Sequence, residues 1–353
     1  MTHHNDPPGV DTPDAYAASG VDIAASDRTV DALVGVLRTI EAGRPSRVVD
    51  LPGHYASVLR VTDELGIAIG TDGVGSKLVV AEETGRLDTV GIDCIAMNVN
   101  DVVCVGAEPI AVLDYLAVEQ ADPDAAAAIA RGLKTGAEAA GVEIPGGELA
   151  VLPELIRGHP SPHGFDLCAS CFGTVALDAI VTGADVAPGD ALVGLPSSGL
   201  HSNGYTLARR ALSSLGYDDR PPELEGDTVA DALLEPTVIY VRAALDLLRS
   251  DVPVHGLAHI TGGGLTNLLR LHRGVGYAIE TPLPVPGIFA LVERLGEVDA
   301  REMWDVFNMG CGFVCVVPAD RAVEAVALLD AHHPGAERIG TVTGRAGEIG
   351  YPA

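Results

Sequence analysis

The octapeptide Gly70-Thr71-Asp72-Gly73-Val74-Gly75-Ser76-Lys77 follows an apolar run, residues 67–69, and precedes a helix-like segment, residues 78–83. This order predicts a turn that leads from a strand into a helix. Its glycines would let the backbone approach a phosphate closely, because glycine has no Cβ and accepts a positive φ. The N–H groups at the start of a helix also favour anions.

Asp72 would repel a phosphate unless a cation lay between them, and Mg²⁺ prefers carboxylate and phosphate oxygens. The octapeptide therefore predicts a metal–nucleotide site, with Gly73 and Gly75 facing the nucleotide. An ordinary surface turn rich in Gly and Asp is the alternative. The stretch lacks the G-x-x-x-x-G-K-[ST] spacing of a Walker A loop.

The composition restricts the class of protein. A chain of 353 residues predicts two domains, and 47% apolar residues can fill two cores. A net charge of −27, from 49 acidic and 22 basic residues, excludes nucleic acid and anionic membranes as partners. No apolar run approaches the ~20 residues of a membrane span. We expect a cytoplasmic protein, and an acidic surface of this kind is typical of adaptation to high salt.

Lysine and cysteine are both rare. Lys77 and Lys134 are the only lysines, which draws attention to the one beside the glycine turn. Cys168 and Cys171 have the spacing of a zinc or redox pair, but they lie in a long apolar run, residues 165–177. Residues i and i+3 of a strand point to opposite faces. We therefore expect small buried side chains in a reducing compartment.

Hydrophobic periodicity and turn residues predict the order of the elements. We expect residues 1–15 to be disordered, one domain over 16–174 and an α/β domain over 175–353. Helices are expected at 27–38, 78–83, 90–106, 123–140, 205–215, 236–248, 265 onward and 319–332. Strands are expected at 57–62, 67–71, 109–119, 143–148, 165–177, 191–195, 255–260, 313–317 and 338–342.

The predicted helix over residues 90–106 carries an unusual polar face. Asp93, Met97, Asn100 and Asp101 share it by the i, i+4 and i+7 rule. Two carboxylates and an amide on an otherwise apolar helix are costly unless something positive lies beside them. We predict that Asp72, Asp93 and Asn100 form a metal site with Glu148, which follows two glycines. The alternative is a buried helix with local hydrogen bonds.

The second half contains two turns rich in hydroxyl groups, amides and glycine, at residues 197–204 and 261–264. Such turns suit a sugar phosphate. His201 and His259 each lie within a few residues of one of these turns, so both are candidate site residues. Either one could instead be a histidine of the core.

Seven motifs then occur in order: G-T-D-G-V-G-S-K, G-I-D-x-x-A-M-x-x-N-D, G-A-E-P, G-G-E, S-S-G-x-H-S-N-G-Y, E-P-T-x-I-Y and A-H-x-T-G-G-G. Together they resemble the phosphoribosylformylglycinamidine cyclo-ligase family, also called aminoimidazole ribonucleotide synthetases. The similarity extends from about residue 16 to residue 342. It implies an ATP-dependent ring closure in purine biosynthesis, with formylglycinamidine ribonucleotide as the substrate.

The resemblance also implies roles for individual residues. Asp72, Asp93, Asn100, Asp101 and Glu148 match positions of the Mg²⁺–ATP site. Lys77 would contact phosphate as a point charge, and His201 would polarise the formyl oxygen or move a proton. The positions near the substrate are matched by Ser198, Asn203, His259, Thr261 and Gly262.

The fold implied by the resemblance is α+β. The first domain is expected to be a mixed sheet with helices that binds ATP and Mg²⁺ and forms a barrel across a homodimer; the second is an α/β sandwich. Residues 52–56 and 149–154 depart from the family pattern, as do Asn98 and the loop 156–164. A related ATP-dependent enzyme, such as thiamine-phosphate kinase, selenophosphate synthetase, formylglycinamidine synthase or the hydrogenase-maturation dehydratase, is one alternative. A non-catalytic nucleotide-binding regulator is another.

Overall fold

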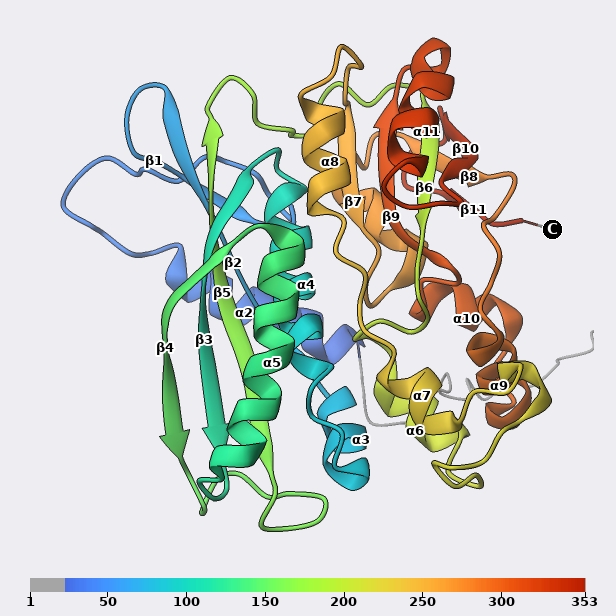
Figure 1. Ribbon diagram of the computed structural model, residues 1–353. Helices are drawn as coiled ribbons and strands as arrows, with labels where there is room; N and C mark the ends of the chain where they lie inside the picture. The colour runs from blue at the N-terminus through green and yellow to red at the C-terminus, as the bar shows by residue number, and fades with distance from the viewer. Residues whose placement is uncertain (1–22, 353) are drawn as a thin grey trace, which may run out of the picture.

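The computed structural model describes residues 23–352 (Figure 1). The predicted disorder of residues 1–15 lies outside that range. The first half contains, in order, α2 (Ile23–Leu37), β1 (Ser57–Arg60), β2 (Leu65–Gly73), α3 (Lys77–Thr84), α4 (Val90–Val103), β3 (Glu108–Val118), α5 (Pro123–Ala140), β4 (Glu143–Val151) and β5 (Phe165–Ala176).

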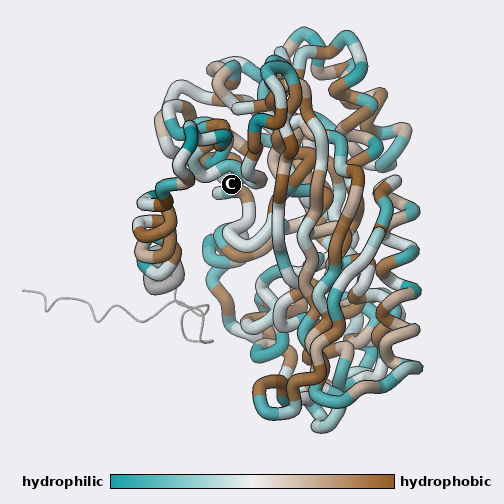
Figure 2. Tube along the Cα trace, turned by 90° about the vertical axis from the view of Figure 1, so that its left-hand side faces the viewer, coloured by the Kyte–Doolittle hydropathy of each residue, from teal (hydrophilic) through white to brown (hydrophobic). Residues whose placement is uncertain are grey.

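The strands of the first half form one mixed sheet in the order β1-β2-β5-β3-β4. Only β3 and β4 run parallel, and α5 forms the crossover between them. Burial alternates along β5, so one face of the sheet packs against helices and the other faces outward. The outward face is turned toward the viewer in Figure 2, where apolar stretches run along its strands.

Helix α4 is the central element of the molecule. It packs on the first sheet and on α5, and it also contacts α8 (Val241–Leu248) and β7 (Gly256–His259) of the second half (Figure 1). All of its residues except Ile92 and Asp101 are buried. Helix α5 can approach α4 closely because Gly132 and Gly91 have no side chains where the two helices meet. A Cβ at Gly132 would lie 3.0 Å from the Gly91 Cα.

The second half forms a six-stranded sheet in the order β11-β8-β10-β6-β9-β7. Its remaining strands are β6 (Ala191–Pro196), β8 (Gly276–Ile279), β9 (Cys311–Val317), β10 (Glu337–Thr343) and β11 (Ile349–Gly350). Its remaining helices are α6 (Tyr205–Ala211), η1 (Pro222–Leu224), α7 (Val229–Leu234), η2 (Gly264–Arg270), α9 (Gly287–Gly296), α10 (Ala300–Val306), η3 (Ala319–Arg321) and α11 (Ala322–Asp330). The α+β class with two separate sheets is thus confirmed.

Most elements lie where the sequence predicts them, but several details differ. Strand β2 continues through Gly73, so Asp72 lies on the strand and only residues 74–76 form the turn. The helix predicted over 236–248 begins only at Val241, because residues 236–240 form no regular secondary structure and instead bond to α4. The segment after Leu265 is a 3₁₀ helix. Within the described part of the chain, six elements have no predicted counterpart: helices η1, α7, α9 and α10 and strands β8 and β11.

Two segments that depart from the family pattern have clear structural roles. The loop 152–164 is held by two buried carboxylates: Glu82 accepts from the backbone N–H of His159 (2.7 Å), and Glu119 accepts from that of Gly158 (2.8 Å). In segment 52–56, Tyr55 donates its hydroxyl hydrogen to the Asn267 carbonyl (3.1 Å). Both segments are therefore fastened to the rest of the fold.

The six cysteines are free, and Cys168 and Cys171 point to opposite faces of β5, as predicted. Within residues 23–352, no helix is both long and apolar enough to cross a membrane.

Candidate active site at the domain junction

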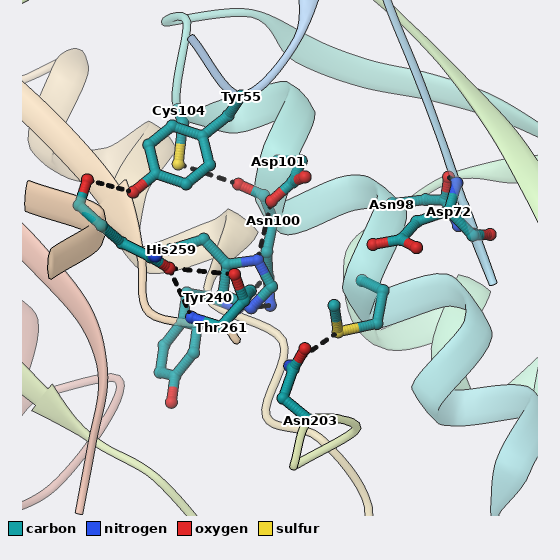
Figure 3. A network of polar contacts seen from close by, with 12 residues as sticks. Tyr55, Asp72, Asn98, Asn100, Asp101, Cys104, Asn203, Tyr240, His259 and Thr261 are labelled. Atoms are coloured by element: carbon teal, nitrogen blue, oxygen red, sulfur yellow. Dashed lines mark hydrogen bonds and ion pairs between the residues drawn. The ribbon is translucent and has the colours of Figure 1, made fainter. Parts of the chain in front are cut away.

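Asp72 lies near the end of β2 and is held there by a side chain of α4. The Asn98 side chain accepts from the Asp72 N–H (3.0 Å) and donates to the Asp72 carbonyl (3.1 Å), as Figure 3 shows. The carboxylate of Asp72 remains free for another partner, apart from a bond to the Gly73 N–H. Partial desolvation raises the pKa of Asp72, and the nearby Asp101 carboxylate raises it further.

Lys77, the first residue of α3, points into the protein and away from solvent. Its ammonium nitrogen lies 2.9 Å from both carboxylate oxygens of Asp93 on α4. It also donates to the carbonyls of Glu235 (2.6 Å) and His201 (3.2 Å) in the second half. Both side chains of the pair are fully buried. Burial lowers the pKa of Lys77, and Asp93 opposes that shift.

The polar face of α4 exists as predicted, but the protein's own chain covers it. Asp93 accepts from the Thr237 N–H (2.8 Å) and hydroxyl (2.6 Å). Asn100 accepts from the Tyr240 N–H (2.9 Å) and donates to the Val238 carbonyl (2.9 Å). Segment 235–240 therefore supplies hydrogen-bond partners for Asp93 Oδ1 and Asn100 where a metal ion was expected. The buried Asp93 Oδ2 has no hydrogen-bond partner among the described residues and is held by its ion pair with Lys77.

The last polar residue of α4, Asp101, pairs with a histidine of the second half. His259 Nδ1 lies 2.8 Å from Asp101 Oδ1, and His259 Nε2 lies 3.4 Å from the Asn100 amide nitrogen (Figure 3). The His259 side chain is fully buried, whereas Asp101 is 19% exposed. Both ring nitrogens of His259 thus have protein partners.

His201 occupies the turn after β6 in a left-handed conformation, with φ = 60°. Its Nε2 accepts from the Ser198 N–H (3.3 Å), so the neutral ring carries its hydrogen on Nδ1. Among the described residues that buried Nδ1 has no hydrogen-bond partner. Burial lowers the pKa of His201 well below its usual value, and the nearby His259 and Lys77 lower it further. The ring is therefore neutral at pH 7.

The predicted substrate residues differ in whether their side chains are already bonded to the protein. Ser198 donates to the Pro236 carbonyl (2.6 Å) and so faces the protein. Asn203 and Gly262 lie close together, since a Cβ at Gly262 would be 3.3 Å from the Asn203 amide oxygen. The Asn203 amide donates only a weak bond, to the Met97 sulfur (3.9 Å). Thr261 donates its N–H (2.8 Å) and hydroxyl (2.9 Å) to the side chain of Asn267.

The predicted metal set of Asp72, Asp93, Asn100 and Glu148 does not assemble within one chain. Across the sheet, Asp72, Ala169, Asp114 and Gly147 form one row, and Gly73, Cys168, Tyr115 and Glu148 form the next. Neighbouring rows point to opposite faces, so the side chains of Asp72 and Glu148 do also. Among residues 23–352, no group of three or more His, Cys, Asp or Glu side chains is placed to hold a metal.

Sequence reasoning missed Asn98, Thr237 and Asn267 as site residues. Each makes at least two hydrogen bonds to a predicted site residue or its backbone. The available signals were the E-P-T-x-I-Y motif for Thr237 and the polar position of Asn98 on an apolar helix. Nothing comparable marks Asn267.

The chain is similar to known proteins in sequence and in structure. The family "AIR synthase related protein, N-terminal domain" matches residues 53–175, and the corresponding C-terminal domain family matches residues 187–351. Among solved structures, hydrogenase maturation protein HypE in complex with ATP superposes with a TM-score of 0.60 at 21% identity, covering 84% of each chain. Thiamine monophosphate kinase from Aquifex aeolicus superposes with a TM-score of 0.60 at 16% identity, covering 91% of this chain and 95% of that one. These likenesses show the fold.

Relatives in sequence are more similar. Phosphoribosylformylglycinamidine cyclo-ligase of Methanothermobacter thermautotrophicus is 50% identical over 95% of this chain and 96% of its own. The enzyme of that name from Thermococcus gammatolerans is 47% identical over 94% of this chain and 96% of its own. Identity at this level over nearly the whole length of both chains, with both domain families in the same order, means that the chain belongs to the phosphoribosylformylglycinamidine cyclo-ligase family.

Proposed function

We propose that this protein is an ATP-dependent cyclo-ligase of purine biosynthesis. It would convert formylglycinamidine ribonucleotide to aminoimidazole ribonucleotide, ADP and phosphate. The observation that carries the proposal is the 50% identity, over 95% of the chain, to a relative named for this activity. The gathering of the motifs of both domains at one junction supports it.

The chemistry explains why ATP is needed. The formamide carbon of the substrate is a poor electrophile, and its oxygen is a poor leaving group. Transfer of the γ-phosphoryl group to that oxygen would give an iminophosphate. The amidine nitrogen of the same molecule could then attack the carbon and expel phosphate. The protein's contribution to such a reaction is positioning and neutralisation of charge.

The nucleotide and its cation would lie beside the end of β2. The turn after Asp72 is open, since a Cβ at Gly75 would meet nothing within 4 Å and Gly75 has φ = 75°. Asp72 would hold a Mg²⁺ ion, because among residues 23–352 its carboxylate accepts only from the Gly73 N–H, and burial and the nearby Asp101 carboxylate raise its pKa, which marks a place for positive charge. Magnesium would neutralise the triphosphate charge. Two solved structures with this fold, hydrogenase maturation protein HypE and AaThiL, are complexes with ATP and with AMPPCP.

We place the substrate beside the second-half turns. Asn203 and Gly262 lie together there, and the Asn203 side chain has only the weak sulfur contact. The unpaired Nδ1–H of His201 is the proposed donor to the formyl oxygen, since an unsatisfied buried donor is costly unless it has a use. His259 and Thr261 would support the site through their protein partners.

A homodimer would explain the outward face of the first sheet. Leu113 and Tyr115 of β3 are 40% and 38% exposed, and Leu65 of β2, which lies on the same face, is 39% exposed. Exposed apolar side chains gathered in this way mark an interface. Glu148 lies on this face, beside Tyr115. A second copy could therefore bring its Glu148 to the nucleotide site of the first.

A coupled assay tests the proposal. Purified protein is incubated with ATP, Mg²⁺ and formylglycinamidine ribonucleotide, and aminoimidazole ribonucleotide, ADP and phosphate are measured. We expect the three products in equal amounts. Thiamine phosphate and selenide serve as control acceptors. ATP turnover with one of these controls and none with formylglycinamidine ribonucleotide would refute the cyclo-ligase assignment.

The acidic composition supports one further proposal, adaptation of the protein to concentrated salt in the cytoplasm. The named relatives give no support to it, so it rests on the net charge of −27 alone. Screening of that charge should raise the midpoint of thermal unfolding as KCl increases. A midpoint that does not change between 0.1 and 1 M KCl (about a threefold change in screening length) would contradict it.

A further inference from the structure

The ammonium group of Lys77 has no hydrogen left for a ligand. A lysine ammonium has three N–H bonds, and three acceptors surround it: the Asp93 carboxylate and the carbonyls of His201 and Glu235. The side chain is fully buried, and the Tyr205 ring lies beside it, with its centroid 5.7 Å from Nζ. A role in binding nucleotide phosphate would require these bonds to break.

The Lys77–Asp93 pair joins the two halves of the molecule. Both residues belong to the first half, whereas His201, Glu235 and Thr237 belong to the second. Asp93 accepts from the N–H and hydroxyl of Thr237 while it holds Lys77. A buried ion pair contributes little net stability, but the loss of one partner is strongly destabilising. Such a pair is therefore better suited to positioning neighbouring groups than to stabilising the fold.

The group that Lys77 holds in position is His201. Its left-handed φ of 60° costs a residue other than glycine about 1–3 kcal/mol, so the surroundings must hold it. Lys77 binds its carbonyl, and the Ser198 N–H holds Nε2 of its ring. Gly312 leaves room for the ring, because a Cβ there would lie 2.6 Å from His201 Cε1. Backbone and ring are thus fixed independently.

We propose that Lys77 is a positioning residue, which acts through the carbonyl of His201 to hold its ring at the domain junction, and that Lys77 does not contact the nucleotide. The inference rests on the proposed function, in which His201 faces the formyl group. Asp93 fixes the ammonium group, and the carbonyl of Glu235 completes its surroundings. The sequence-based assignment of Lys77 to phosphate is replaced by this one.

The first test needs no activity. The chain has two lysines, so acetic anhydride labelling followed by peptide mass spectrometry compares Lys77 directly with Lys134, which is exposed on α5. We expect Lys77 to react at least about 100-fold more slowly than Lys134, with or without Mg-ATP, because reaction requires local opening. Equal labelling of the two lysines, or labelling of Lys77 that Mg-ATP suppresses, would overturn the proposal.

The second test is kinetic. Lys77→Met alone leaves Asp93 buried and unpaired and can fail to fold, so the test uses Lys77→Met with Asp93→Asn. We expect kcat to fall about 100-fold, as for a displaced catalytic group, while the KM for Mg-ATP stays within about threefold. Lys134→Met is the matched control and should behave as wild type. A raised KM with unchanged kcat would instead indicate a nucleotide contact.

The third test separates positioning from general support of the fold. His201→Asn removes the imidazole, and asparagine tolerates the left-handed conformation. In that background the paired Lys77 and Asp93 changes should lower kcat by less than about twofold, because their effect passes through His201. A multiplicative loss would show that they act elsewhere. If wild-type protein makes no aminoimidazole ribonucleotide, the proposed function fails, but the labelling result still tests Lys77.

Discussion

Asp101 Oδ1 lies 2.8 Å from His259 Nδ1, and this contact joins the end of α4 to the end of β7. Helix α4 carries three such connections to the second half, made by Asp93, Asn100 and Asp101. Polar groups that are buried in this way are costly unless they are paired. The motifs of the first half therefore hold the two domains in register, and only part of their polar surface remains for ligands.

Loss of the Asp101 carboxylate should destabilise the junction. In Asp101→Ala the buried His259 Nδ1–H has no partner, so we expect the free energy of unfolding to fall by about 1–3 kcal/mol. Urea denaturation followed by fluorescence measures it. Asp63→Ala, in the exposed turn between β1 and β2, is the control and should change stability by less than about 0.5 kcal/mol. Equal stability of the two variants would show that the contact contributes nothing.

Two asparagines near α4 should give opposite phenotypes. Asn98→Ala removes both bonds to the Asp72 backbone, so we expect a loss of about 1–3 kcal/mol of stability and a weaker affinity for Mg-ATP. Asn203→Ala removes only the weak contact with the Met97 sulfur and should leave stability within about 0.5 kcal/mol. That variant should instead raise the KM for formylglycinamidine ribonucleotide. Thermal unfolding measures the stability of both variants, and steady-state kinetics measures their KM values. The same phenotype in both variants would contradict the prediction.

Mixing inactive variants tests whether one site is built from two chains. Asp72 and Glu148 point to opposite faces of one sheet, so a shared nucleotide site needs Glu148 from a second copy. Asp72→Asn and Glu148→Gln should each be inactive. After unfolding and refolding together in equal amounts, about half the dimers are mixed and each has one intact site, which restores about 25% of wild-type activity. No recovery would place both residues in one chain's site or exclude one of them.

Protonation of His54 should lower stability at acidic pH. Burial and the Arg270 cation lower the pKa of His54 from its usual 6.5 to about 4. Between these values the unfolded chain binds a proton that the folded chain does not, so stability falls as pH falls. His54→Gln should reduce the loss between pH 7 and pH 4 by about 3 kcal/mol. Urea denaturation across this range measures it, with His163→Gln on the exposed loop as control. Identical pH dependence in wild type and His54→Gln would show that protonation of His54 does not cause the loss of stability.

The regular elements were largely predictable because their causes are local. The Asp122-Pro123 start of α5 is confirmed, with the Asp122 side chain accepting from the N–H groups of Asp124 and Ala125. The hairpin of β1 and β2 and the buried helix over residues 90–103 are also where the sequence predicts them. Residues 236–240 were misassigned as helix because their backbone bonds to Asp93 and Asn100 are long-range.

By itself, the sequence determined the family, the two-sheet α+β class and part of the set of residues that gather at the junction, since these depend on motif order and local periodicity. It also indicated correctly that the polar face of α4 needs partners. Only the tertiary structure decided which groups are those partners. Lys77 and the segment 235–240 occupy the place beside α4 where the sequence had suggested a metal ion. The reason is physical: a buried carboxylate requires compensation, but an ammonium group and backbone N–H groups can provide it as well as a metal can.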